Sequence, residues 1–172
     1  MTETIEKGTS RTQGSAQGST RTQTLHFTLN LPQPVEKVWA AVATPGGLPE
    51  WLAAADVLEP RLGGAVTLRW LNGDEAASHS GQVTAWDVER VAEYTIDLHG
   101  RCRFHLEPSA AGGTTVRFTN EFEGDDALRL DCLAGWHNHF EFLADALAGR
   151  PKDWSGWSLD RWRELRAGYE AD

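Results

Sequence analysis

The chain has 172 residues and a formal net charge of −9, with 40% hydrophobic and 24% charged residues. These values are typical of a soluble globular protein that is long enough for one domain with a substantial core. An acidic surface repels a phosphate backbone, so the charge argues against nucleic acid as a partner. No window approaches the roughly 20 apolar residues of a membrane span, and the N-terminus lacks the apolar segment of a signal peptide. We therefore expect a cytoplasmic protein without a membrane span.

The two cysteines, Cys102 and Cys132, occur in no pattern that is typical of a metal site. In a reducing compartment we expect both to be small buried hydrophobic residues rather than partners in a disulfide. The sequence also lacks a Walker loop, a GxGxxG run and an HExxH run. It therefore predicts no metal and no other cofactor.

The first 22 residues are rich in Thr, Gln, Gly and Ser, and only Met1, Ile5 and Ala16 among them are apolar. Such a segment buries too little surface to offset the entropy lost on ordering it. We therefore expect a disordered tail over residues 1–22 and a single domain over residues 23–172.

The domain is expected to begin with a strand, because apolar and polar residues alternate from Leu25 to Leu31. Pro32 and Pro34 end this strand, and Pro34 suits the first turn of a short helix. A second short helical segment over residues 48–52 carries Trp51.

Between residues 55 and 122, short apolar runs alternate with turn residues. This pattern predicts six short strands joined by tight turns, that is, an antiparallel meander. Such a sheet has one solvated face and one packed face, so a single apolar helix must cover the packed face.

The segment 125–149 predicts that helix. Asp125 and Asp126 fall in its first turn, where the helix dipole favours negative charge, and Gly149 followed by Pro151 is a stop signal. Gly135 in its middle indicates close approach of a strand or a ring, with a slight kink as the alternative. Its apolar residues recur at steps of three and four, as on one helix face. They are Leu128, Cys132, Leu133, Trp136, Phe140, Leu143 and Leu147.

The segment after Pro151 predicts a short final helix, because Leu159, Trp162, Leu165 and Tyr169 have helical spacing. We expect this helix to pack onto the domain as a lid. The alternative is a homodimer contact, since several exposed tryptophans are typical of interfaces.

The order of strand, two short helices, six strands and long helix resembles the helix-grip fold of the START-like (SRPBCC) superfamily. Within it, the chain is similar to the branch named after the heat-shock-protein ATPase activator homologues. The similar stretches are PVEKVWAAVATPGGLPEWL, VLEPRLGGAVTLRW, GQVTAWDVERVAEYTI, GGTTVRFTNEF and AGWHNHFEFLADALAGRP, which together span about residues 25–169. The resemblance implies an α+β fold in which an antiparallel seven-stranded sheet wraps around the long C-terminal helix.

This fold implies a cavity between the long helix and the concave face of the sheet. Aromatic pockets with a few polar groups are the usual sites for small molecules. A single aromatic ring more often fills a core, but eight tryptophans in one small domain are hard to pack without gaps. The predicted ligand-binding residues are Trp51, Trp70, Trp86, Tyr94, Phe104, Phe118, Trp136, His139, Phe140 and Leu143.

His139 is the candidate polar group of this cavity, because it falls on the helix face that is expected to meet the sheet. The alternative is a core histidine with one hydrogen-bond partner. His137 lies two residues away and points elsewhere, so the two cannot share a metal ion. We expect His137 to form a solvated pair with Glu141, and His79 and His99 to be exposed near strand ends.

A basic stripe of Arg101, Arg103 and His105 shares one face of a predicted strand. We expect this face to be solvated. In the opposite register, Arg103 and His105 would enter the cavity and bind an anionic ligand.

These features favour a protein that binds a small apolar or amphipathic molecule, with no motif that establishes catalysis. One alternative is an enzyme of the cyclase or dehydratase kind found elsewhere in the superfamily. It would act on a carbonyl compound, with His139 and either Tyr94 or Glu121 as acid and base. A further alternative is a co-chaperone or interaction module that uses the tryptophan-rich tail.

Overall fold

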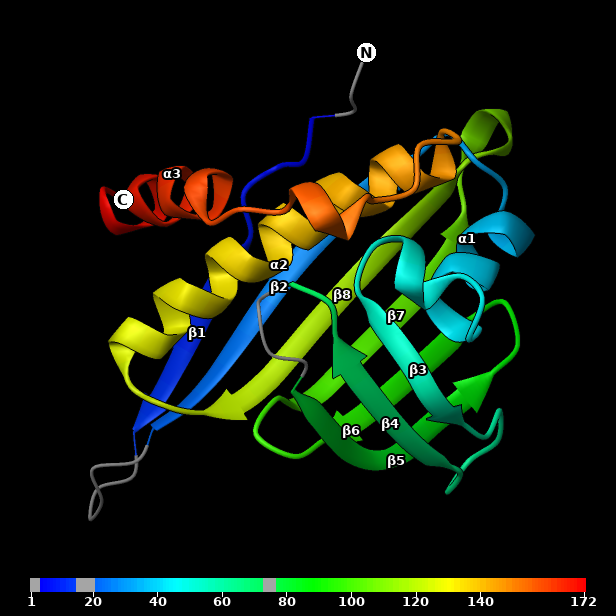
Figure 1. Ribbon diagram of the computed structural model, residues 1–172, viewed down its shortest axis with the longest axis horizontal. Helices are drawn as coiled ribbons and strands as arrows, with labels where there is room; N and C mark the ends of the chain where they lie inside the picture. Colours follow the sequence, from blue (N-terminus) through cyan, green and yellow to red (C-terminus); the bar gives the residue numbers. More distant parts are fainter. Residues whose placement is uncertain (1–3, 15–20, 73–76) are drawn as a thin grey trace.

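The computed structural model describes residues 4–14, 21–72 and 77–172 and has an α+β fold (Figure 1). Its strands are β1 (Thr9–Gly14), β2 (Arg21–Leu31), β3 (Ala53–Leu58), β4 (Ala65–Trp70), β5 (Ser78–Asp87), β6 (Val91–Ile96), β7 (Gly100–Pro108) and β8 (Thr114–Glu123). Its helices are α1 (Val35–Ala43), α2 (Asp126–Leu147) and α3 (Asp160–Glu170), with 3₁₀ turns at Leu48–Glu50, Ala110–Gly112 and Trp154–Gly156. The expected helix-grip arrangement is confirmed.

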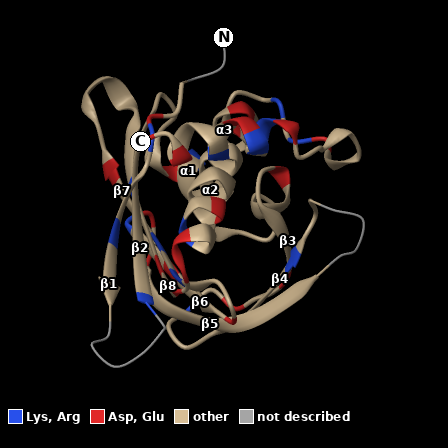
Figure 2. Cartoon of the chain, turned by 90° about the vertical axis from the view of Figure 1, so that its left-hand side faces the viewer, with Lys and Arg blue, Asp and Glu red and all other residues tan. Residues whose placement is uncertain are grey.

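The strands form one antiparallel sheet in the order β1-β2-β8-β7-β6-β5-β4-β3. The register shifts between Ala55 and Val57 in β3 and between Val83 and Ala85 in β5. Such bulges bend a strand and increase its twist. Figure 2 shows the sheet curving around α2, with α3 on the opposite side of that helix.

The eighth strand is β1, and it corrects the expectation of a disordered tail over residues 1–22. Thr9 to Gly14 pair with β2 in register from Thr9–His26 to Gly14–Arg21. The pairing satisfies backbone groups on the edge of β2, and this needs no apolar side chains. Ile5 is also buried. Residues 1–3 and 15–20 of the expected tail lie outside the described residues.

Helix α2 begins and ends as its sequence predicts. The Asp125 carboxylate accepts a hydrogen bond from the backbone N–H of Leu128 at 2.8 Å, which caps the first turn. Gly149 follows the last turn with φ +91°, a conformation that glycine adopts without steric cost. None of the helices in the described ranges is long and apolar enough to cross a membrane.

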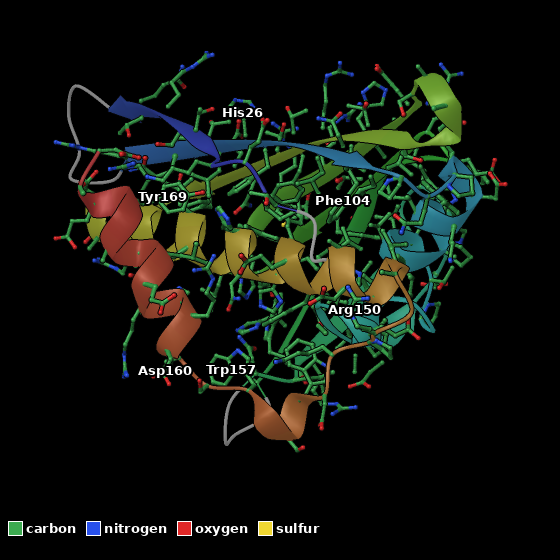
Figure 3. All side chains as sticks on the ribbon, turned by 90° about the horizontal axis from the view of Figure 1, so that it is seen from above. His26, Phe104, Arg150, Trp157, Asp160 and Tyr169 are labelled. Carbon is green, nitrogen blue, oxygen red and sulfur yellow. The ribbon has the colours of Figure 1, made fainter. Side chains whose placement is uncertain are left out.

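The tail after α2 packs onto the domain, as expected. Figure 3 shows it running back along α2 from Arg150 through Trp157 and Asp160 to Tyr169. The indole N–H of Trp154 donates to the Pro49 carbonyl oxygen at 2.8 Å, and that of Trp162 donates to the Asp131 carbonyl oxygen at 3.1 Å. The homodimer alternative stays a prediction.

Residues near the two ends of the described chain contact each other beside α2. The Gly8 backbone N–H donates to the Tyr169 hydroxyl oxygen at 2.8 Å. The Lys7 ammonium group lies 2.6 Å from the Asp172 carboxylate and also donates to the Gly168 carbonyl oxygen. Segments at opposite ends of the sequence therefore form one continuous contact.

The register of β7 settles the orientation of the basic stripe. Cys102, Phe104 and Leu106 point into the core and are buried. Arg101 and Arg103 lie on the outer face, where both donate to the Glu93 carboxylate, at 3.2 and 3.0 Å. The expected solvated orientation is confirmed, and this stripe does not line the cavity.

Candidate functional site

A pocket of about 550 Å³ opens between the N-terminal half of α2 and the β4–β5 end of the sheet. Its lining comes from α2, α3, the ends of β4, β5 and β8, and the β6–β7 turn. The apolar lining residues are Leu52, Trp70, Leu98, Phe122, Leu128, Cys132, Gly135, Trp136 and Trp162. The polar lining residues are Asn72, His79, His99, Asn120, Glu123, Asp131 and His139.

Three tryptophans form the aromatic walls of this pocket, and each indole N–H already has a protein acceptor. Trp70 donates to His79 Nδ1 at 2.9 Å, and Trp136 donates to the Asn120 side-chain oxygen at 2.9 Å. Trp162 donates to the Asp131 carbonyl oxygen, as described above. The rings therefore present apolar surface to the pocket, and their polar atoms are satisfied elsewhere.

Asn120 is a buried residue of the pocket lining that forms several hydrogen bonds. Its amide nitrogen donates to the carbonyl oxygens of His99 and Arg101, at 2.9 and 3.1 Å. Its side-chain oxygen accepts the Trp136 N–H, so all of its hydrogen-bonding groups are engaged. Asn120 fixes the β6–β7 turn and Trp136 relative to each other, and the sequence analysis did not identify it.

His79 and His99 are not exposed, which corrects their expected position. The two imidazole rings lie 4.8 Å apart, and His99 also packs on Trp70 at 4.6 Å. Burial, with a smaller contribution from the neighbouring His79, lowers the pKa of His99 to about 4. At neutral pH His99 is therefore an uncharged part of the wall. The two residues come from different strand ends, His79 from the start of β5 and His99 from the β6–β7 turn, and no local pattern indicates that these ends meet.

His139 reaches the inner end of the pocket and is buried. Its Nδ1 lies 2.9 Å from the Trp51 carbonyl oxygen, so this nitrogen carries the proton and donates. Burial lowers its pKa to about 4, although the hydrogen bond to Trp51 opposes that shift. No described residue forms a hydrogen bond with its Nε2. His139 therefore has one unprotonated nitrogen without a described protein donor.

His137 points away from the pocket, and the expected solvated pair with Glu141 is wrong. His137 is buried, and its Nδ1 lies 2.7 Å from the Tyr169 hydroxyl oxygen. Burial lowers its pKa, while the nearby Glu141 acts in the opposite direction. The Glu141 carboxylate instead pairs with Arg161 of α3 at 2.7 Å. The docking of α3 onto this face of α2 removes both groups from the expected arrangement.

The ten predicted ligand-binding residues fall into three places. Trp70, Trp136 and His139 line the pocket. Trp86 packs against Trp39 with ring centroids 5.0 Å apart and is not among the lining residues. The remaining six are buried together in the core: Trp51, Tyr94, Phe104, Phe118, Phe140 and Leu143.

The acid–base groups of the enzyme alternative do not converge. The Tyr94 hydroxyl donates to the Val42 carbonyl oxygen at 2.8 Å, and burial raises its pKa well above the ordinary value. Glu121 lies on the outer face of the sheet, 3.3 Å from Arg101. His139 therefore has neither of its proposed partners within the pocket.

Cys132 contributes an apolar surface rather than a nucleophile. Burial, with a smaller contribution from the nearby Asp131, raises the pKa of its thiol to about 12. The Cys102 thiol is buried and has a pKa of about 12 for the same main reason. Both cysteines are free. Within residues 4–14, 21–72 and 77–172, no three His, Cys, Asp or Glu side chains gather in a way that could hold a metal ion.

Trp162 is the nearest ring to Gly135, but it does not make the close approach that was expected at this position. A methyl group at this position would lie 3.9 Å from Trp162 Nε1, which is an ordinary contact distance. This ring comes from α3, and the sequence gives no sign that this helix returns to the pocket.

Two apolar side chains at the mouth of the pocket were also not predicted from the sequence as pocket residues. Leu98 in the β6–β7 turn has φ +69° and a side chain that is 82% exposed. Leu128 on the first turns of α2 is 38% exposed. A leucine with positive φ is uncommon, because the side chain crowds the backbone there. The mouth of the pocket is therefore apolar on two opposing elements.

Comparison with known proteins supports the fold. The family model for activator of Hsp90 ATPase homolog 1-like proteins matches residues 32–148. A solution structure of a Bordetella parapertussis protein is 23% identical, with 97% of this chain and 91% of that chain covered and a TM-score of 0.69. A conserved protein of unknown function from Enterococcus faecalis is 14% identical, with coverage of 94% and 88% and a TM-score of 0.67.

A third solved structure, from Mesorhizobium loti, is 23% identical and covers 73% of this chain and 97% of that chain, with a TM-score of 0.64. At these identities the structural likeness supports the fold alone. No functionally curated protein matches the chain.

Proposed function

The chain belongs to the family of activator of Hsp90 ATPase homolog 1-like proteins, and from the geometry of its pocket we propose that it binds a small apolar or amphipathic molecule. The ligand would lie between the N-terminal half of α2 and the β4–β5 end of the sheet. The occupied indole N–H groups of Trp70, Trp136 and Trp162 carry this proposal. They leave an apolar surface that a polar ligand would not match.

The size of the pocket supports the same ligand class. A volume of about 550 Å³ lies within the range of roughly 300–1,000 Å³ that is usual for small-molecule sites. Seven of the sixteen described lining residues are polar, and such groups can orient a mainly apolar ligand. His139 is one such residue, and its unprotonated Nε2 could accept a hydrogen bond from a ligand donor that reaches it.

A neutral fluorescent dye tests the proposal directly. N-Phenyl-1-naphthylamine is expected to bind with a single class of site and to increase in fluorescence as it leaves water. The variant Trp70→Ala removes one wall and is expected to weaken dye binding at least about fivefold, because the lost apolar contact is worth on the order of 1 kcal/mol.

Trp86→Ala is the matched control for this experiment. Trp86, like Trp70, is a half-buried tryptophan on the sheet, but it packs against Trp39 outside the pocket. Dye affinity is expected to be unchanged in this variant. Absence of dye binding to the wild-type protein, or equal losses in both variants, would contradict the proposal. Mass spectrometry of the extracted protein would add the identity of any molecule that co-purifies.

A further inference from the structure

The charged groups in the pocket are of one sign. Among its sixteen described lining residues there is no Lys or Arg, and the two charged ones are the carboxylates of Glu123 and Asp131. These two residues flank the end of β8 and the first turns of α2, next to the mouth. A ligand that enters here meets negative charge before it reaches the aromatic walls.

The two carboxylates differ in how far the protein neutralises them. Asp131 Oδ1 lies 2.6 Å from Arg166 Nε, and Arg166 also bonds Glu170, so its charge is shared between two carboxylates. Glu123 is exposed, and no described residue forms an ion pair or a hydrogen bond with its side chain. The mouth therefore keeps a net negative charge, in a chain whose formal net charge is already −9.

The N-terminus of α2 offers no compensating site for an anion. Helix N-termini attract anions through their free backbone N–H groups. Here the Asp125 carboxylate already accepts from the Leu128 N–H, and Asp126 adds a second negative charge in the first turn. This end of the helix is capped by the chain's own carboxylates.

The aromatic walls suit a cation as well as an apolar chain. The faces of tryptophan rings attract ammonium groups, and the attraction increases when the cation loses part of its water. The Trp162 indole N–H donates to the backbone carbonyl oxygen of Asp131, so this ring lies over the turn of α2 that carries Asp131. His99 and His139, with pKa values of about 4, add no positive charge at neutral pH.

From this arrangement we infer that the ligand is an amphipathic cation. Its apolar part would lie against Trp70 and Trp136, and its ammonium group would lie at the mouth beside Glu123 and Asp131. The inference rests on the proposed function, because it names the ligand class of the same pocket. A fatty acid or another apolar anion would instead bring its carboxylate against two carboxylates with no lysine or arginine in the lining.

The test uses three amphiphiles that share one tail and differ in charge. Dodecyltrimethylammonium, dodecanol and dodecanoate compete with bound N-phenyl-1-naphthylamine at pH 7, below the concentrations at which they form micelles. We expect the ammonium compound to displace the dye at about a tenfold lower concentration than dodecanoate, with dodecanol between them.

Three variants test whether the preference for the ammonium compound over dodecanoate comes from the carboxylates at the mouth of the pocket. Glu123→Gln is expected to weaken binding of the ammonium compound about two- to fivefold, the size of an exposed charge interaction. Glu123→Lys is expected to move the preference towards dodecanoate. Asp126→Asn is the matched control, because it removes a carboxylate close to the mouth that pairs with Arg129 and does not line the pocket. Dye affinity should stay the same in Asp126→Asn, and the dye affinity measured for each Glu123 variant is used to convert its displacement data into amphiphile affinities.

The outcomes separate this inference from the proposed function. If the dye does not bind, the proposed function fails and the inference fails with it. If the dye binds but the three amphiphiles compete equally, or dodecanoate competes best, the pocket stands and the cationic ligand class is overturned. If Asp126→Asn has the same effect as Glu123→Gln, the preference reflects net charge rather than the mouth, and the inference is also overturned.

Discussion

The two halves of α2 face the same sheet and have opposite surroundings. In the C-terminal half, Phe140, Leu143 and Leu147 are 0%, 0% and 4% exposed. In the N-terminal half, Cys132, Gly135 and Trp136 are only partly buried and line an open pocket. One continuous helix thus serves as core at one end and as the wall of an open pocket at the other.

The difference comes from what covers each half rather than from the helix itself. Helix α1 and the turn at Leu48–Glu50 close the packed half, and Trp51 fills the space there. The Trp51 indole N–H donates to the Ala41 carbonyl oxygen at 2.8 Å, and its ring stacks on Phe140 at 6.0 Å. No described strand or helix closes the other half in the same way. Apolar spacing along a helix therefore identifies the inner face but not which part of it stays open.

The largest expected effect is a loss of stability in the packed half. Phe140→Ala is expected to lower the free energy of unfolding by about 3–5 kcal/mol, because the ring is fully buried among other aromatic rings. Leu128→Ala in the open half is expected to cost less than about 1 kcal/mol, since that side chain is already 38% exposed. Urea unfolding followed by circular dichroism measures both. Similar losses in the two variants would erase the distinction between the halves.

His139 lies between the two halves of α2, and its titration should make the free energy of unfolding depend on pH. Below its ordinary pKa of 6.5 the unfolded chain binds a proton there, while the folded chain does not until about pH 4. The free energy of unfolding should therefore be highest above pH 6.5 and should decrease as the pH falls towards 4. The contribution of His139 is on the order of 3 kcal/mol, from about 1.36 kcal/mol per unit of pKa shift.

His139→Asn is the variant that isolates this contribution. Its amide nitrogen can still donate to the Trp51 carbonyl oxygen, but it does not titrate. Stability should decrease less steeply between pH 6.5 and pH 4 than in the wild type. His99, whose pKa is also lowered to about 4, keeps part of the slope in both proteins. A variant with an unchanged slope would show that His139 is not buried as described.

The smallest expected effect is a gain at Gly135 in the open half. Gly135→Ala should raise the free energy of unfolding by up to about 1 kcal/mol, because alanine is the better helix former. The added methyl group meets only Trp162 Nε1, at 3.9 Å, so it needs no rearrangement. Thermal unfolding measures the change. A destabilised variant would indicate that the open half is packed more tightly than the pocket implies.

Much of the fold follows from patterns that are local in the sequence. The alternation from Leu25 to Leu31, the steps of three and four in α2, and the signals at Asp125 and Gly149 each depend on neighbouring residues. Backbone geometry converts such patterns directly into strands, helices and caps. The resemblance then indicated how these elements are arranged.

The parts that could not be predicted depend on contacts between distant segments. Strand β1 has almost no apolar residues and forms because β2 offers it backbone partners. His137 is buried because Tyr169, 32 residues later, returns to it. The same holds within the pocket, where Trp162 arrives from α3 and Asn120 from the far end of β8. Periodicity in the sequence does not indicate contacts between distant segments. It therefore could not show which inward-facing residues line the pocket, and six of the ten expected pocket residues lie in the core.

The contact between Gly8 and Tyr169 has a consequence for how the protein can be shortened. A chain cut at the expected domain boundary would start at Gln23 and keep all of α2, the pocket lining, strands β3 to β8 and most of β2. It would nevertheless lose the Lys7 and Gly8 partners of α3, the helix that carries Trp162. Lys7 and Gly8 thus hold α3 in place from the other end of the sequence, and removing them is expected to loosen one wall of the pocket from a distance.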